Sequence, residues 1–235
     1  DQAVKGPFGI LWYGEPGPRQ RVDRHARGPV PLVIDGIVFL TGYDLVMAYD
    51  VYNGSKYWER WIPGITRLDL PAGTSNLVAD SQSLFVVADN KRCLRLDRLT
   101  GKTLQTYEAP EIDGKPGSWG WIAWFEDILL GSHSAYDTKR KRAMPNLADG
   151  LFAINPRTGQ TLWAYHGSSI EHDGIAVDDG RVLLVDRNLD VNEKKAALAN
   201  RIVDGSVKDR SLDRRGKPVE PDLGKLVALE VRTGK

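Results

Sequence analysis

The sequence has 235 residues, of which 41% are hydrophobic and 27% are charged, and this composition excludes a disordered chain. The 32 Lys and Arg residues nearly balance the 31 Asp and Glu residues, so charge gives no indication of a nucleic-acid partner or of an acidic membrane surface. No apolar run reaches the ~18 residues of a membrane span. The single cysteine, Cys93, cannot form an internal disulfide and is expected to be a buried structural thiol.

The first 28 residues contain one apolar burst, at residues 10–13, between glycines and prolines. This burst predicts a lone outer strand that belongs to a preceding structural unit. A linker with several Arg residues follows it. We therefore expect residues 1–28 to hold an outer strand and a linker, and residues 29–235 to hold the repeated units described next.

The first complete unit reads P-L-V-I-D-G, I-V-F-L-T-G, L-V-M-A-Y-D and K-Y-W-E-R-W-I-P. Four short β-rich segments separated by Asp-Gly and Asn-Gly turn signals predict a four-stranded antiparallel meander. The pattern returns three more times along the chain. The expected units are approximately 29–64, 73–110, 116–167 and 171–235.

Two of these units are lengthened by insertions, at 134–149 in the third and 188–224 in the fourth. The first insertion is expected to be a polar loop between the second and third strands of its unit. The second contains E-K-K-A-A-L-A-N-R-I-V, which predicts a short helix with Ala197, Leu198 and Ile202 facing inward. Both insertions leave their units at the same point, which is typical either of a recognition surface or of loops that tolerate insertions.

A short turn motif ends the third strand of every unit. An Asp, Asn or Glu stands four residues before a Gly, and in two units a Trp follows that Gly by four residues, whereas Gln105 takes this place in the second unit. The acid or amide can accept hydrogen bonds from turn amides, and Gly can adopt the left-handed conformation. The motif residues are Asp50, Gly54, Trp58, Asp97, Gly101, Asn155, Gly159, Trp163, Glu230 and Gly234.

These acid-x-x-Thr-Gly-x-x-x-Trp repeats resemble those of the quinoprotein (PQQ-type) β-propeller family, in which the Trp docks against the neighbouring blade. Other strings, such as C-L-R-L-D, are similar to PQQ-binding-like propellers of planctomycete-type multidomain proteins. A period that starts near ~45 residues and grows by insertion is also typical of radial repeats. The resemblance implies an all-β propeller of four-stranded antiparallel blades, with about four blades present as part of a larger ring.

The resemblance leaves several functions open, because a fold alone does not fix an activity. The favoured hypothesis is a non-catalytic binding or interaction scaffold in an exported, periplasmic or otherwise extracytoplasmic protein, with a protein partner or small-molecule ligand at the propeller face. The alternative is a dehydrogenase domain that uses PQQ and Ca²⁺ to oxidise alcohols or sugars, although the vicinal cysteines common in such enzymes are absent. A third is a propeller fused to a catalytic domain outside this sequence. Remaining blades would come from the parent chain or from another copy.

In a propeller the first strand of each blade lines the central channel, so residues that enter these strands surround its mouth. The unit alignment places Arg27, Asn76, Trp119, His172 and Asp173 there. Arg27 could pair with a carboxylate of a flat anionic cofactor, Trp119 could stack on it, and a His-Asp pair could supply a base. The alternative is that Trp119 packs between blades with Trp121 and Trp124, and that His172 is a hydrogen-bonded loop residue.

Overall fold

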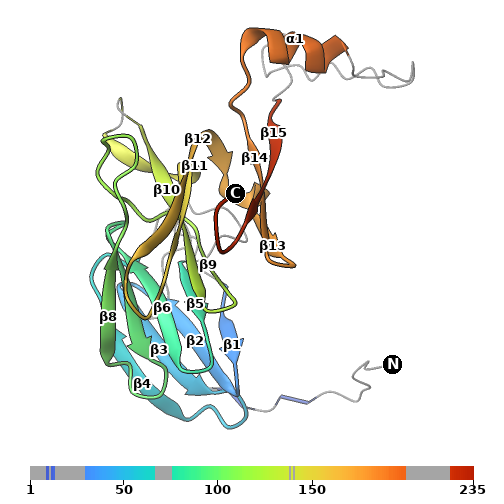
Figure 1. Ribbon diagram of the computed structural model, residues 1–235. Helices are drawn as coiled ribbons and strands as arrows, with labels where there is room; N and C mark the ends of the chain where they lie inside the picture. Colours follow the sequence, from blue (N-terminus) through green and yellow to red (C-terminus); the bar gives the residue numbers. More distant parts are fainter. Residues whose placement is uncertain are drawn as a thin grey trace.

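The structure is a computed structural model that describes residues 9–10, 12–13, 30–66, 76–137, 139, 141–199 and 223–235. Short antiparallel strands gathered into successive sheets make up most of this part of the chain (Figure 1). The predicted all-β class is therefore confirmed. Within the described residues, the helices are the 3₁₀ turn η1 (His172–Gly174) and α1 (Val191–Ala199), neither of them long and apolar enough to cross a membrane.

The first two sheets are four-stranded meanders, as predicted. Sheet I has the order β1-β2-β3-β4 and sheet II the order β5-β6-β7-β8. Sheet I consists of β1 (Leu32–Ile34), β2 (Ile37–Gly42), β3 (Leu45–Asp50) and β4 (Lys56–Trp61). Sheet II consists of β5 (Leu77–Ala79), β6 (Ser83–Ala88), β7 (Arg92–Asp97) and β8 (Thr103–Glu108).

The third and fourth sheets share one strand pairing, at Ile170 and Asp186, so they form one seven-stranded hydrogen-bonded array. Sheet III is again a sequential meander, and sheet IV pairs β14 with strands on both sides. Sheet III consists of β9 (Ile122–Phe125), β10 (Ile128–Asp137), β11 (Arg142–Ile154) and β12 (Thr161–Glu171). Sheet IV consists of β13 (Ala176–Asp178), β14 (Arg181–Asp186) and β15 (Lys225–Glu230).

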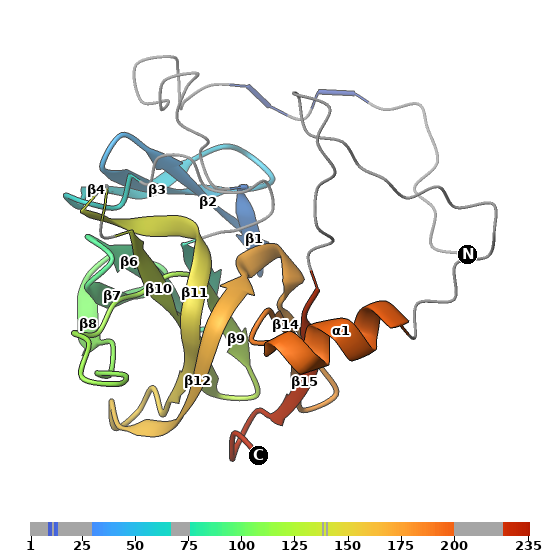
Figure 2. The same ribbon diagram turned by 90° about the horizontal axis from the view of Figure 1, so that it is seen from above.

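The sheets stand side by side like blades, as the view from above shows (Figure 2). The first strands of neighbouring sheets adjoin, since β1 contacts β5 and β5 contacts β9. The outer strands β4 and β8 carry mostly exposed side chains. This order, with the first strand inside and the last outside, is the blade arrangement of a β-propeller.

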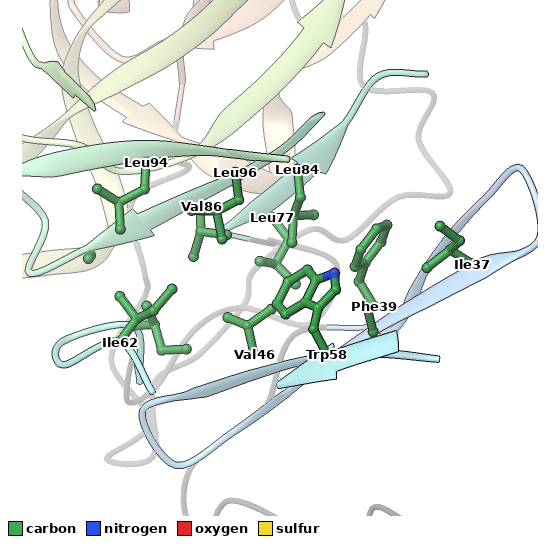
Figure 3. Packing of buried hydrophobic residues seen from close by; sticks show 13 residues of the cluster. Ile37, Phe39, Val46, Trp58, Ile62, Leu77, Leu84, Val86, Leu94 and Leu96 are labelled. Carbon is green, nitrogen blue, oxygen red and sulfur yellow. The ribbon is translucent and has the colours of Figure 1, made fainter. Parts of the chain in front are cut away.

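Apolar side chains fill the spaces between successive sheets. The cluster between sheets I and II is built from side chains such as Phe39, Val46 and Trp58 on one side and Leu84 and Leu96 on the other. Figure 3 shows the two sets pointing toward one another. Separate clusters fill the junctions of sheet II with III and of sheet III with IV. Sheet II packs against a neighbouring sheet on both faces, so β6 is buried along its whole length, as expected for a strand between two covered faces.

Cys93 lies in one of these clusters, on β7, and is fully buried. Burial raises the pKa of its thiol well above the ordinary value. The prediction of a buried structural thiol is confirmed.

The turn motif has its glycine in the left-handed region in all four sheets, and in sheets I to III the acid or amide side chain also accepts hydrogen bonds from turn amides. The Asp50 carboxylate accepts hydrogen bonds from the amides of residues 52 and 53, and the Asp97 carboxylate accepts them from residues 99 and 100. The Thr100 hydroxyl, together with these amides, lowers the pKa of Asp97. Each motif glycine has a φ between 69° and 76°, where an L side chain is strained. The motif thus fixes a tight turn between the third and fourth strands.

An indole docks on this turn from the preceding sheet. The Trp58 Nε1 donates to the Arg98 carbonyl at 2.8 Å, and its ring covers Gly101. In the same way, the Trp163 Nε1 donates to the Val231 carbonyl at 2.7 Å. Both repeat tryptophans thus contact the turn of the next sheet, and each indole satisfies its N–H while it buries apolar area.

Two members of this docking series were not predicted. Trp12 donates to the Val51 carbonyl at 2.8 Å and lies over the turn glycine of sheet I. In the junction that lacks a Trp, the Tyr107 hydroxyl donates to the Pro156 carbonyl at 2.6 Å. Trp12 therefore occupies the place of an outer-strand indole, whereas most of residues 1–28 lies outside the described part of the chain.

The insertion at 134–149 is not the polar loop that we expected. Residues up to 137 continue β10, and residues from 142 continue β11, so the insertion lengthens a hairpin. Register shifts beside Ser134 absorb the extra length. At its base, the His133 Nδ1 lies 2.6 Å from an Asp149 oxygen, which anchors the arm. The loop prediction failed because alternating small and polar residues can pair as strands as readily as they form loops.

The helix predicted in the second insertion is present as α1. Asp190 caps it, because its Oδ1 accepts hydrogen bonds from the amides of Asn192 and Glu193, while the Glu193 carboxylate accepts one from the Asp190 amide. Ile202 lies outside the described residues, as do the side chains of Ala197 and Leu198. Both insertions leave between the second and third strands of their sheets, as predicted.

Candidate functional site

Asn76 immediately precedes β5, where the sequence places it at the channel mouth. Its side chain is fully buried. The Nδ2 donates to the Ile65 carbonyl at 2.9 Å and to the Val87 carbonyl at 3.3 Å. The amide thus joins the segment leaving sheet I to the second strand of sheet II, and it works as a structural clamp.

Trp119 lies between sheets II and III. It is fully buried, and its ring meets the Phe152 ring edge-on, with centroids 4.9 Å apart. A Cβ on Gly131 would lie 2.7 Å from the Trp119 ring, so this glycine makes room for it. Trp124 stacks on Phe85 in the same junction at 5.0 Å. These contacts favour the packing alternative for Trp119 over cofactor stacking.

His172 and Asp173 form η1, directly before β13. His172 is buried, with its Nε2 2.9 Å from the Ser132 Oγ. The same Oγ accepts a hydrogen bond from the Trp121 amide at 2.7 Å, so the Ser132 hydroxyl can donate its own proton to the imidazole. Asp173 is exposed. His172 therefore pins the entry of sheet IV to sheet III, and of this pair only the Asp173 carboxylate faces solvent.

Most of the predicted mouth residues that the structure describes are enclosed by the protein. Arg27 lies outside the described residues. Asn76, Trp119 and His172 are at most 2% exposed, so neither an indole face nor an amide edge is available to a flat ligand. In the described residues, no group of three or more His, Cys, Asp or Glu side chains could hold a metal ion. A cofactor role for these residues stays a prediction.

Sheet IV presents an apolar face that the described residues leave open. Leu183, Val185 and Leu226 are 38%, 41% and 75% exposed, whereas Val182 and Leu184, on the other face of the sheet, are buried against sheet III. In the register of the sheets, Leu183 corresponds to three fully buried residues of sheets I to III. These are Phe39, Phe85 and Leu130. Sheet IV thus exposes the face that, in each of sheets I to III, is covered by the next sheet along the chain.

A buried carboxylate holds sheets III and IV together. Asp186 accepts hydrogen bonds from the amides of Ser168 and Ser169 at 3.1 Å, and from the Tyr165 hydroxyl at 3.1 Å. Burial and the nearby Asp186 carboxylate raise the pKa of Tyr165 from 10.0 to about 12. The clamp therefore depends on a neutral phenol.

This raised pKa predicts a loss of stability in alkali. Between pH 10 and about 12, the unfolded chain releases the Tyr165 proton while the folded chain keeps it, so the free energy of unfolding falls as the pH rises. The Tyr165→Phe variant should lose stability less steeply across this window. Urea unfolding midpoints measured at several pH values test this. Equal slopes for both proteins would contradict the assignment.

Comparison with known proteins gives consistent results. Residues 10–235 match the protein family described as outer membrane protein assembly factor BamB. A curated protein of that name from Alkalilimnicola ehrlichii is 31% identical over 126 residues, which is 47% of this chain and 30% of that protein. The chain thus spans less than a third of this relative's length.

Solved structures of low sequence identity share the fold. The quinohemoprotein alcohol dehydrogenase ADHIIG from Pseudomonas putida HK5 has a TM-score of 0.56 at 14% identity, over 92% of this chain and 34% of that one. The corresponding enzyme from Comamonas testosteroni has a TM-score of 0.54 at 15% identity, over 90% and 34%. At such identities the likeness concerns the propeller fold alone.

Proposed function

Because this chain belongs to the family described as outer membrane protein assembly factor BamB, we propose that its PQQ-like β-propeller domain is a non-catalytic interaction scaffold. By analogy with the curated relative, the protein is exported and works in an extracytoplasmic compartment. Cell fractionation tests this location, and recovery of the protein in the cytoplasm would contradict it.

The exposed apolar face of sheet IV carries the proposal. Soluble proteins seldom expose a continuous aliphatic sheet face unless it is an interaction site. The partner that fits is another sheet of the same repeat type, because such a sheet covers the corresponding face at every earlier junction. In a solution of this chain alone, a second copy is the available partner.

We expect the chain to self-associate through this face. Leu226→Asp places a charge in the contact, and burying an unpaired charge is costly, so association should weaken by about a hundredfold or more. Sedimentation velocity over a range of protein concentrations measures the effect. Leu104→Asp, at a 54% exposed position on the outer strand of sheet II, is the matched control and should leave association unchanged. A wild-type chain that stays monomeric at every concentration would contradict this surface.

The absence of catalysis is tested separately. Addition of pyrroloquinoline quinone with Ca²⁺ is expected to give no cofactor absorbance and no dye-linked oxidation of alcohols or sugars. The packing of Trp119 and Asn76 supports this expectation, because both side chains are engaged inside the protein. Quinone binding with turnover would replace the scaffold proposal by a dehydrogenase.

A further inference from the structure

The connector between sheets II and III contains a small hairpin of its own. Ile112 and Lys115 form an isolated antiparallel bridge, and their backbone groups exchange hydrogen bonds of 3.2 and 3.0 Å. The two residues between them have φ angles of 52° and 72°, as in the tight turns of hairpins. Ile112 is buried, and a Cβ on Gly150 of β11 would lie 3.0 Å from its Cδ1. This connector hairpin, residues 111–116, is therefore seated on sheet III.

The buried His133 side chain of β10 contacts both the connector hairpin and β11. Its Nδ1 lies 2.6 Å from the Asp149 Oδ1, and its Nε2 lies 3.0 Å from the Pro116 carbonyl oxygen. Neither neighbour has a proton to offer, because one is a carbonyl and the other is a carboxylate paired with the Lys115 ammonium at 2.7 Å. Both ring nitrogens therefore act as donors, and only the imidazolium form of histidine can donate from both.

The charged groups around this imidazole come from three segments. β11 contributes Asp149, and the connector hairpin contributes Lys115, Asp113 and the exposed Glu111. The hydrogen bond to the Asp149 carboxylate raises the pKa of Lys115, so this amine stays charged. β12 contributes His166, whose Nδ1 lies 2.7 Å from the Asp113 Oδ1. Two histidine–carboxylate contacts thus hold the connector hairpin to sheet III, one buried and one exposed.

We propose that the His133 contacts form a pH-sensitive latch, which holds the connector hairpin on sheet III while the imidazole is protonated. The neutral ring keeps a single N–H, so either the Pro116 carbonyl or the Asp149 carboxylate then faces a nitrogen lone pair. A buried acceptor without its donor is unfavourable, and the connector relieves this by moving away from the ring. The latch is therefore closed at low pH and opens as the pH rises, in the manner of other histidine switches.

Opening of the latch is a local event, because other contacts hold the residues that follow the connector. The Ser118 hydroxyl donates to the Ser134 carbonyl at 3.3 Å, and the Trp119 amide donates to the Asn90 carbonyl at 2.7 Å. These bonds keep the entry of sheet III in place while the connector hairpin lifts. Opening uncovers Ile112, so the surface beside the arm of β10 and β11 depends on pH. This inference goes beyond the scaffold proposal and does not rest on it.

Two NMR measurements on the full chain test the latch. Side-chain ¹⁵N spectra at about pH 5 should show a proton on both ring nitrogens of His133. Amide hydrogen exchange of Ile112 and Lys115 is expressed as protection factors, which divide out the intrinsic effect of pH. These factors should fall about tenfold or more between about pH 5 and about pH 9, a range that includes the ordinary titration of histidine. The Gly101 amide, in a turn of sheet II, is the internal control and should keep its protection.

The Asp149→Asn variant should remove the pH dependence while it keeps both contacts of the ring. The new amide can accept a hydrogen bond from the imidazolium through its oxygen, or donate one to Nδ1 of the neutral ring through its nitrogen. In the second case the Nε2 proton still reaches the Pro116 carbonyl. The protection factors of Ile112 and Lys115 should therefore be equal at the two pH values.

Asp113→Asn is the matched control, because it makes the same change in the exposed contact with His166. It should keep most of the wild-type loss of protection. Protection in the wild type that does not change with pH, or a single protonated ring nitrogen at about pH 5, would overturn the proposal. An undiminished pH dependence in Asp149→Asn would do the same. Neither measurement depends on self-association, so failure of the scaffold proposal would leave this test standing.

Discussion

Replacement of Trp58 by Ala should lower the free energy of unfolding by about 3–5 kcal/mol, the range typical of a buried Trp reduced to Ala. The side chain is 8% exposed and packs between sheets I and II, among the residues shown in Figure 3. Its loss removes the hydrogen bond to the Arg98 carbonyl and uncovers the turn glycine of the next sheet. Urea denaturation followed by circular dichroism measures the change.

Trp61 supplies the control for this prediction. It lies on the same strand, β4, but is 69% exposed. Trp61→Ala should therefore change the free energy of unfolding by no more than about 0.5 kcal/mol, as for most surface positions. Equal losses in the two variants would mean that the contact between sheets does not depend on the docked indole.

The turns and the docking could be predicted from the sequence because both depend on local spacing. The acid and the glycine that close one turn lie within five residues of each other. The Asp97 side chain is therefore close to the turn amides that donate hydrogen bonds to it. The docked indole is fixed in the same way, since Trp58 follows its own turn at a constant distance. Repeated local spacing therefore predicts both the sheet and its contact with the next sheet.

The replacement for the missing indole could not be predicted in this way. Tyr107 reaches the Pro156 carbonyl from a position two residues beyond Gln105. Recognising this replacement requires the strand register, which includes a shift after Arg95. The sequence alone shows only that the second repeat has Gln105 at the Trp position.

The channel mouth shows a different limit of sequence reasoning. The sequence places Asn76 and Trp119 correctly before the first strands of their sheets, because strand order follows from the repeats. It does not show which way each side chain turns. The absence of a side chain at Gly131 leaves room for the Trp119 ring between the sheets. Gly131 is twelve residues from Trp119 in the sequence, so their contact depends on how the strands pack.

Gly101 should tolerate even a methyl group poorly. Its φ of 69° is in the left-handed region, and a Cβ would lie 2.7 Å from the Trp58 ring. Gly101→Ala therefore adds backbone strain of about 1 kcal/mol to the effect of overpacking, about 1–3 kcal/mol. We expect the free energy of unfolding to fall by about 2–4 kcal/mol, measured by urea denaturation.

Gly114 separates the two contributions. Its φ is 72°, but a Cβ there would meet nothing within 4 Å. Gly114→Ala should therefore show the backbone cost alone, about 1 kcal/mol. The difference between the two variants measures the contact of the turn with the indole, and it should vanish when Trp58 is already Ala, because the ring that the methyl group would strike is gone. A difference that persists in that background would show that the turn glycine is required by its own sheet and not by the docked indole.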